Sequence, residues 1–289
     1  MEFQERYETY RKAVEAFLDG QFRGAPRWKG LYDSMRYSLL LGGKRIRPVL
    51  VLEFARLGGL DWKLALPAAC AVELVHTFSL IHDDLPCMDD SDTRRGKPAN
   101  HIAYGETMAV LAGDTLQAEA YRLILESPGL EAGARADCAL ILSKASGAAG
   151  MAAGQVLDTL CVSETKAEVE EVHRLKTGAM IAGSCQMGAA AAGGDEAYRN
   201  AAAEYGYALG LAFQIRDDML DVIGDAGEFG KPTGSDAQAG KRTFVDFFGL
   251  EGCAQQVAAC TDQALSAAAP YDKDGFLLKL ARSLMERRS

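Results

Sequence analysis

The chain has 289 residues, of which 48% are hydrophobic and 25% charged, and its formal net charge is −9. This composition is that of a globular protein with a substantial core, and the acidic balance argues against broad nucleic-acid binding, because phosphate backbones require a basic face. Abundant Ala and Gly, with only 8% aromatic residues, favour closely packed helices over a sheet.

The first residues, MEFQERYETYRKAVEAFL, are charged throughout and lack the continuous apolar core of a secretory signal. Seven cysteines, an odd number without a CxxC pair, are typical of reduced thiols in a cytosolic protein. The apolar run from Leu64 to Ile81 is interrupted by Glu73 and His76, which predicts a buried helix and no membrane span. We therefore expect a cytoplasmic protein.

Helical periodicity runs through almost the whole chain. No Pro/Gly/Ser-rich linker, low-complexity tract or fixed-period repeat divides it, so we expect a single all-helical domain over residues 1–289. The expected helices cover about 3–18, 28–41, 48–57, 64–84, 106–126, 132–147, 148–160, 166–191, 195–223 and much of the last 45 residues, with loops over 89–101 and 224–242.

The segment GGKRIRP (42–48) joins two of these helices and carries three cations in four residues. Glycines allow close backbone approach, and Pro48 is well placed in a first helical turn. Cations at a helix start oppose the helix dipole unless an anion binds there, so the segment is a candidate phosphate site. It is not a P-loop, because the GxxxxGK[ST] spacing is absent.

A first aspartate cluster, DDLPCMDD, occupies residues 83–90. Adjacent carboxylates repel one another, and such clusters usually hold a cation. Asp83 and Asp89 would lie on different faces of an unbroken helix, but Pro86 breaks the helix and allows Asp89 to fold back toward Asp83. An EF-hand is excluded, because arginine stands where calcium ligands are needed.

Arg94 and Arg95 follow the acids directly, and Lys97 comes two residues later. Adjacent arginines on a loop can each bind a phosphate through two hydrogen bonds, although surface arginine pairs are often merely solvated. His76, on the apolar helix before the acids, has two readings at this point: a core histidine or a ligand.

A second cluster, Asp217, Asp218 and Asp221, ends the long predicted helix 195–223. Asp217 and Asp221 lie one turn apart on one face, which Gln214 joins. Acids at a helix C-terminus oppose the dipole, which suggests a compensating cation. Further cations stand at Lys176, Lys231 and Lys241, and no Ser/His/Asp or Cys/His nucleophile arrangement accompanies them. Together these features predict metal ions that clamp a diphosphate between two acidic clusters.

Four segments, in this order, resemble the short-chain trans-prenyltransferases of the polyprenyl synthetase family, above all bacterial farnesyl diphosphate synthases and next geranylgeranyl diphosphate synthases. They are GGKRIRP (42–48), LVHTFSLIHDDLPCMDDSDTRRGKP (74–98), HRLKTGAMI (173–181) and FQIRDDMLDVIGD (213–225). The resemblance implies an all-α isoprenoid synthase fold, a helical bundle around a deep central cavity, and a homodimer. It also implies head-to-tail condensation of isopentenyl diphosphate with dimethylallyl or geranyl diphosphate.

The same resemblance implies three Mg²⁺ ions and the following site residues. Asp83 and Asp89 would bind two ions and Asp217 the third, with Asp84 and Asp221 in support. The allylic diphosphate and its departing pyrophosphate would be held by Arg94, Lys176, Thr177, Gln214, Lys231 and Lys241, and isopentenyl diphosphate by Lys44, Arg47, His76 and Arg95. The catalytic set would be Asp83, Asp84, Asp89, Lys176, Gln214 and Asp217.

Product length is expected to depend on Phe78 and Ser79, five and four residues before Asp83. In relatives, an aromatic residue at the fifth position before the acids tends to stop growth at fifteen carbons, so Phe78 favours farnesyl diphosphate; the alternative is plain core packing of Phe78 and a geranylgeranyl product. Ser91 departs from the acid that relatives often carry there.

Three competing readings are weaker. A terpene cyclase would carry an (N/D)Dxx(S/T)xxxE second motif and no second basic set, and head-to-head squalene-type synthases lack GGKRxRP. A non-catalytic partner subunit usually loses one acid cluster, and this chain keeps both.

Overall fold

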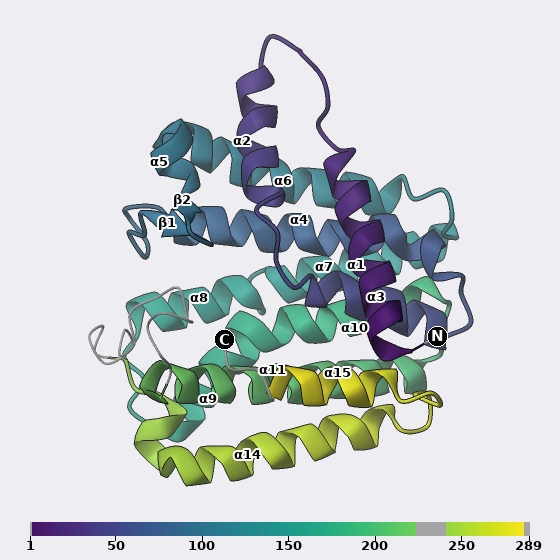
Figure 1. Ribbon diagram of the computed structural model, residues 1–289, viewed down its shortest axis with the longest axis vertical. Coiled ribbons are helices and arrows are strands. Elements are labelled where there is room, and N and C mark those ends of the chain that lie inside the picture. Colours follow the sequence, from purple (N-terminus) through teal and green to yellow (C-terminus); the bar gives the residue numbers. More distant parts are fainter. Residues whose placement is uncertain (1, 224–240, 286–289) are drawn as a thin grey trace. The chain divides into compact units, whose positions relative to one another are not determined.

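The computed structural model describes residues 2–223 and 241–285 (Figure 1). The fold is all-α, as predicted: apart from one two-stranded hairpin, the regular elements of the described residues are helical. The chain divides into two compact units, an N-terminal unit (residues 1–140 and 190–193) and a C-terminal unit (141–189 and 194–289). The expectation of one domain over 1–289 stays a prediction.

The N-terminal unit is built around a helix that is apolar on every face, which is the pattern of a buried helix. This helix, α4, is completely buried from Ala68 to Val72, and α6 runs alongside it (Figure 1). The elements of this unit are α1 (Phe3–Asp19), α2 (Lys29–Leu39), α3 (Ile46–Leu57), η1 (Trp62–Ala65), α4 (Leu66–Asp83), β1 (Thr93–Arg94), β2 (Lys97–Pro98), α5 (Asn100–Tyr104), α6 (Glu106–Leu125) and the start of α7 (Ala132–Ser146).

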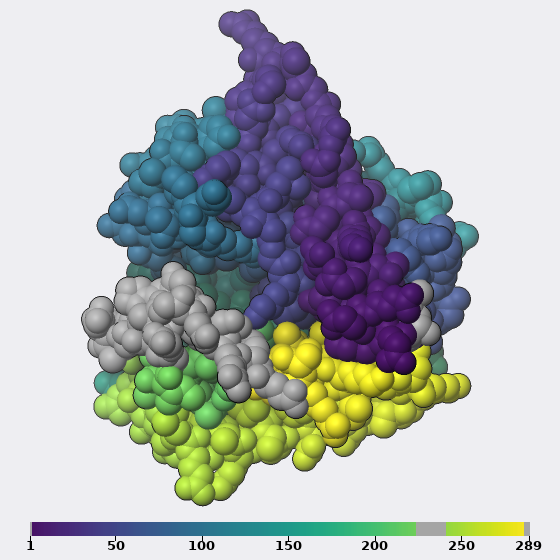
Figure 2. All heavy atoms as spheres, in the orientation of Figure 1, coloured from purple at the N-terminus to yellow at the C-terminus, as the bar shows by residue number. Residues whose placement is uncertain are grey.

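The stretch Trp62–Asp83 has the length and the mean hydropathy, 1.7, that a membrane-crossing helix needs. In this fold 61% of its 18-residue apolar window is buried within the protein, as in the core helix of a globular unit. The segment between α1 and α2 is different: it projects from the N-terminal unit (Figure 2), and the side chain of Trp28 is 60% exposed there.

The C-terminal unit packs helices closely, because glycines bring backbones together. A Cβ on Gly206 would lie 2.4 Å from the Cα of Ala182, and one on Gly210 would lie 2.9 Å from the Cα of Gly178. The unit contains the end of α7, α8 (Met151–Leu160), α9 (Lys166–His173), η2 (Arg174–Gly178), α10 (Ala179–Ala191), α11 (Glu196–Ile223), α14 (Phe244–Ala268) and α15 (Phe276–Met285), with α14 running along α11.

Two segments differ from the sequence prediction. The expected helix over 166–191 is interrupted at Arg174–Gly178 by a π-helical turn, η2. The expected loop over 89–101 contains the β1–β2 hairpin and the start of α5. Most of the loop expected over 224–242 lies outside the described residues.

Candidate active site

The first aspartate cluster folds back on itself, as predicted. Helix α4 ends at Asp83, and the backbone N–H of Asp89 then donates to the carbonyl of Asp83 at 2.8 Å. Asp90 takes a left-handed conformation with φ 49°, which completes the turn. Asp83 is half-buried and Asp89 exposed. The break at Pro86 therefore brings these two residues together on one backbone turn.

Asp84 has a different environment from its neighbours. It is only 2% exposed, and Arg94 Nε donates to both of its carboxylate oxygens at 3.1 Å, with a further bond from Arg94 Nη2. Asp84 and Arg94 thus form a forked ion pair, a geometry that fixes the guanidinium plane. This pairing ties the hairpin to the end of α4.

Arg94 ends β1, and Arg95 begins the two-residue turn that leads to β2. Arg95 and Gly96 both have positive φ, 54° and 71°, as the tight turn of a β-hairpin requires. A non-glycine residue in this conformation is strained, and such strain is frequent at functional sites. The Arg95 guanidinium lies against Gly43, where an added Cβ would meet Nη1 at 2.7 Å. The second glycine of GGKRIRP, Gly43, therefore makes room for Arg95.

The first arginine at the start of α3 is neutralised by carboxylates of the protein. Arg45 is buried; its guanidinium donates to Glu73 at 2.6 Å, to Glu15 at 2.8 Å, and to the Leu39 carbonyl that ends α2. We expected an anion to offset the three cations here, and for Arg45 two glutamates do so. Lys44 is exposed.

Arg47 is in a different position. Its Nε is buried and has no hydrogen-bond partner among the described residues. A buried donor without a partner is costly, and it is a site where an anionic oxygen would be stabilised. Glu73 favours its charged form, but burial outweighs this and lowers the pKa of Arg47.

His76 lies in the same positive field. Burial, followed by the guanidinium groups of Arg47 and Arg95, holds the pKa of His76 well below its usual value, so the imidazole is neutral at pH 7. A neutral imidazole can donate one hydrogen bond without adding repulsion to the arginines. The N-terminal unit thus brings Arg47, His76 and Arg95 together, as expected for an anion site.

Within this unit a small, partly open pocket lies beside the paired Asp84 and Arg94. Its lining combines apolar residues of α4 with polar groups of the hairpin and α2: Ser38, Leu41, Thr77, Leu80, Ile81, Asp84, Arg94, Arg95 and Asn100. Phe78 and Ser79 do not line it, and both are half-buried.

The second aspartate cluster splits into two faces of α11. Asp217, Asp221 and Gln214 are all half-buried on the face predicted to bind a cation. Asp218 points elsewhere: it is 5% exposed, with its Oδ2 3.2 Å from His173 Nε2 and 2.9 Å from the backbone N–H of Phe244, which donates to it. Asp218 therefore joins α9, α11 and α14.

Lys176 and Lys241 meet at a residue that sequence reasoning missed. Both ammonium groups donate to Asp158 Oδ2, at 2.6 Å and 2.7 Å. Burial would raise the pKa of Asp158, but the two lysines outweigh it and hold that pKa below its usual value. In the sequence, Asp158 stands one helical turn after Gly154 in α8, which hints at a functional face of that helix. The sequence gives no local link between this face and Lys176, so the ion pair could not be predicted. Lys231 lies outside the described residues.

The π-helical turn η2 places Lys176 and Thr177. Such turns widen the helix and are frequent at functional sites. Gly154 of α8 packs directly on this turn, since an added Cβ would lie 2.2 Å from the backbone nitrogen of Lys176. Close contact between α8 and η2 is what brings Asp158 within reach of the Lys176 ammonium.

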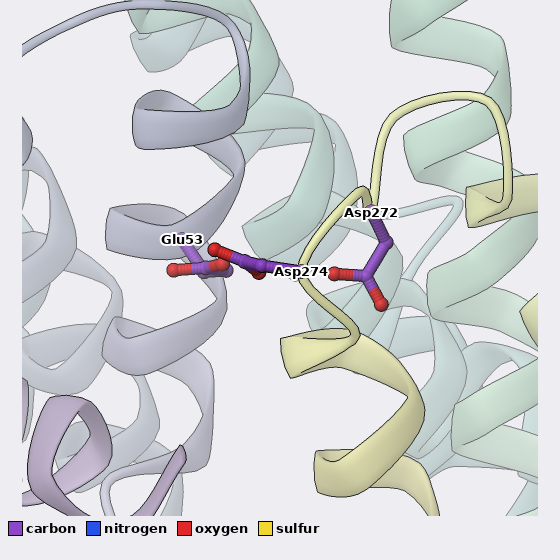
Figure 3. Close-up of side chains that lie close together, drawn as sticks. All are labelled: Glu53, Asp272 and Asp274. Atoms are coloured by element: carbon purple, nitrogen blue, oxygen red, sulfur yellow. The ribbon is translucent and has the colours of Figure 1, made fainter. Parts of the chain in front are cut away.

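Glu53 is a buried acid with a structural role. Figure 3 draws Glu53 of α3 with Asp272 and Asp274 of the segment before α15. Glu53 belongs to the N-terminal unit, is fully buried, and accepts hydrogen bonds from Arg56 at 2.7 Å, from Tyr10 at 2.9 Å and from Arg6 at 3.3 Å. Asp272, in the C-terminal unit, accepts from the N–H of Leu278 at 3.0 Å. Glu53 therefore has its charge balanced by arginines of its own unit.

The residues of both predicted clusters fit a hard divalent cation. The first cluster offers the carboxylates of half-buried Asp83 and exposed Asp89, and the second those of half-buried Asp217 and Asp221. Carboxylate oxygens are the donors that Mg²⁺ prefers over softer ligands. Asp84 and Asp218, by contrast, are engaged by arginine and by histidine. The clusters belong to different units, so their joint action on one diphosphate stays a prediction.

The all-helical fold and the two aspartate helices define the class of protein: this is an isoprenoid synthase fold. A crystal structure of an FPP/GFPP synthase from Zymomonas mobilis matches with a TM-score of 0.87 and 33% identity, covering 98% of each chain. The polyprenyl synthetase profile matches residues 29–274. The chain belongs to the polyprenyl synthetase family, and it is a prenyltransferase.

Relatives of two product classes are similar over nearly their whole length. Farnesyl diphosphate synthases of Haemophilus influenzae and Geobacillus stearothermophilus are 37% and 42% identical; the alignments cover 99% of each chain in the first case, and 96% of this chain and 95% of the relative in the second. A geranylgeranyl diphosphate synthase of Cyanophora paradoxa is 38% identical over 92% of this chain and 90% of its own. Overall similarity therefore does not distinguish a fifteen-carbon from a twenty-carbon product.

Proposed function

We propose that this prenyltransferase condenses isopentenyl diphosphate head-to-tail with dimethylallyl and then geranyl diphosphate, and releases farnesyl diphosphate. The single observation that carries the two-substrate reaction is the basic cluster of the N-terminal unit. Arg47 has a buried donor without a partner among the described residues, and it lies with His76 and Arg95 in one positive field. A cyclase, which ionises one diphosphate alone, has no use for this second anion site.

In this proposal Lys44, Arg47, His76 and Arg95 bind isopentenyl diphosphate. The allylic diphosphate is held by Arg94, Lys176, Thr177, Gln214, Lys231 and Lys241. The ion pairs of Lys176 and Lys241 with Asp158 support this assignment. They keep two ammonium groups close together, where both can bind the same diphosphate.

The polyprenyl synthetase family is in general Mg²⁺-dependent. We assign three ions to this chain, held by Asp83, Asp89 and Asp217, with Asp84 and Asp221 in support. When bound, Mg²⁺ neutralises the charge of the departing pyrophosphate.

The chain's own residues then act on the substrates. Lysine and arginine donors stabilise the pyrophosphate as the allylic carbon–oxygen bond breaks, and the dipoles of Gln214 and the Lys176–Thr177 backbone face the resulting carbocation. The isopentenyl double bond attacks that cation, and a proton leaves to the pyrophosphate. No separate protein base is required.

We assign the fifteen-carbon product to Phe78, with Ser79 beside it. The aromatic ring stands five residues before Asp83, where bulk would stop the growing chain. Geranylgeranyl diphosphate is the alternative product. In that case Phe78 is a core-packing residue and does not limit chain growth.

Homodimer formation and a cytoplasmic location are part of this proposal. Support for a homodimer comes from exposed apolar side chains on adjacent helices of the N-terminal unit. Ile102 and Tyr104 of α5 are 53% and 38% exposed, and Val110 and Leu111 of α6 are 39% and 50% exposed. Exposed apolar groups in such numbers are typical of protein interfaces. Light scattering after gel filtration would measure the mass.

The test is to incubate the purified protein with Mg²⁺, isopentenyl diphosphate and either dimethylallyl or geranyl diphosphate, and to identify the product by mass spectrometry. We expect farnesyl diphosphate from both starters, and none when isopentenyl diphosphate is omitted. A C20 product would replace the farnesyl assignment by the geranylgeranyl one. An absence of any prenyl product from the protein alone would favour a non-catalytic partner subunit.

A further inference from the structure

A glycine in the middle of α6 is required by its neighbour on α4. Gly113 is buried, and a Cβ built on it would lie 2.2 Å from His82 Nε2, 2.5 Å from Cδ2 and 2.9 Å from Cε1. Real Cβ atoms do not approach other atoms so closely, so the imidazole occupies the space that any other residue would fill. Glycine in a helix interior is unfavourable relative to alanine. Gly113 therefore costs helix stability, and the packing of the His82 ring against it is the structural reason for a glycine at this position.

The imidazole itself is held in one orientation. His82 Nε2 lies 3.1 Å from the carbonyl oxygen of Val110, one turn before Asp114 on α6. A carbonyl can only accept, so Nε2 carries the proton in this hydrogen bond. Asp114 Oδ1 lies 3.9 Å from the same nitrogen, beyond hydrogen-bonding distance. The ring is thus fixed by the backbone of α6 on one side and by Gly113 beneath it.

Phe78 packs against this fixed ring. Phe78 and His82 stand one turn apart on α4, so their side chains share a face. Their ring centroids are 5.3 Å apart and their planes make an angle of 88°, an edge-to-face contact. The chain of contact therefore runs from Gly113 through His82 to the residue assigned above as the stop for chain growth.

We infer that Gly113 and His82 are specificity-determining positioning residues, which hold the Phe78 ring where it ends chain growth. This inference rests on the proposed function and deepens it: Gly113 leaves space for the imidazole, and the imidazole sets the position of the phenyl ring. Neither residue needs to touch the reacting atoms for this role. The expected consequence of losing either one is a longer prenyl product.

The test is the ratio of C20 to C15 product formed from geranyl and isopentenyl diphosphate with Mg²⁺, measured at equal extents of conversion. In Gly113→Ala the new methyl group displaces the His82 ring, and we expect this ratio to rise roughly 2- to 10-fold, the equilibrium factor for one aromatic edge-to-face contact. Gly30→Ala is the matched control. Gly30 lies in a helix of the same unit, and its added Cβ would meet only Met108 at an ordinary 3.7 Å, so the ratio should not change.

Two double-mutant comparisons decide whether the effect passes through these contacts. His82→Ala should raise the ratio by itself, and adding Gly113→Ala to it should change nothing further, because the ring that the methyl group displaces is gone. Likewise, His82→Ala should have no effect on product length when Phe78 is already alanine. Independent, additive effects in either comparison would overturn the inference, and so would an unchanged ratio in both single variants.

Failure of the proposed function gives a different result. If the unaltered protein makes no prenyl product, or if Phe78→Ala leaves the product at C15, the proposed function or its chain-length assignment fails first. If Phe78→Ala lengthens the product and His82→Ala does not, only the positioning role fails. Thermal unfolding followed by circular dichroism identifies a variant that does not fold; should Gly113→Ala be one, the comparison of His82→Ala with and without Phe78→Ala still decides.

Discussion

Lys176 and Asp158 link the predicted diphosphate-binding turn to α8: Lys176 Nζ donates to Asp158 Oδ2 at 2.6 Å. Lys241, which precedes α14, reaches the same oxygen at 2.7 Å. One carboxylate therefore holds two ammonium groups that would otherwise repel each other. This relationship predicts that Asp158 positions the two lysines proposed to bind the allylic diphosphate.

Asp158→Asn removes the charge that keeps the two lysines together. Charge-assisted hydrogen bonds contribute about 1.5–3 kcal/mol, so we expect the KM for the allylic diphosphate to rise roughly tenfold, with the circular dichroism spectrum unchanged. Steady-state kinetics with dimethylallyl and geranyl diphosphate measures this. Asp262→Asn, at an exposed position on α14, is the control and should leave KM unaltered. An unchanged KM in Asp158→Asn would contradict the positioning role.

The same group predicts a pH dependence of stability. The pKa of Asp158 is lowered in the folded protein, so the ion pairs stabilise the fold above the unfolded-state pKa of about 3.9 and this contribution is lost as the pH falls below it. The difference in unfolding free energy between the unaltered protein and Asp158→Asn should therefore be constant from about pH 8 to pH 5. Urea titrations at several pH values should find it shrinking below about pH 4. A difference that persists undiminished at lower pH would show that the lysines are not its source.

His173 contacts Asp218, the buried member of the second aspartate cluster. Its Nε2 lies 3.2 Å from Asp218 Oδ2, and its ring stacks on Phe244 with centroids 5.4 Å apart. His173→Ala leaves a buried carboxylate with one partner fewer, which costs about 1–3 kcal/mol of unfolding free energy. His173→Phe keeps a ring against Phe244 and should lose less. Urea unfolding of both variants measures the two contributions, and equal losses would mean that the stack adds nothing.

Arg94 holds Asp84 through a forked pair that lysine cannot reproduce. Since Asp84 is 2% exposed, Arg94→Ala leaves a buried charge unpaired and should cost about 3 kcal/mol or more. Arg94→Lys should recover part of this. In the double variant with Asp84→Asn the loss should be smaller than the sum of the two single losses. Additive losses in that cycle would exclude direct coupling of the pair.

Local sequence rules predicted most of the helices. The helix over 106–126 is observed as Glu106–Leu125, and that over 195–223 as Glu196–Ile223. The break at Pro86 was also predicted, together with the return of Asp89 toward Asp83. These features depend on periodicity, proline and glycine, which act within a few residues of the chain.

Features that depend on distant partners were not predicted. The π-helical turn at Arg174–Gly178 carries an ordinary helical pattern, and its geometry comes with the close packing of Gly154 on Lys176. The β1–β2 hairpin places Arg95 in a left-handed conformation that its residue type does not favour. In both places tertiary contacts outweigh local preference.

The sequence by itself determined the helical fold, the two acid clusters and the family, because spacing along a helix decides which side chains share a face. Only the tertiary structure decided which residues of the same type are paired within the protein and which remain available to a ligand. Arg45 is neutralised by Glu15 and Glu73, whereas Arg47 keeps a buried donor without a partner among the described residues. Their roles separate because the energy of a charged group depends on its burial and on partners brought close by folding, and neither is a property of local sequence.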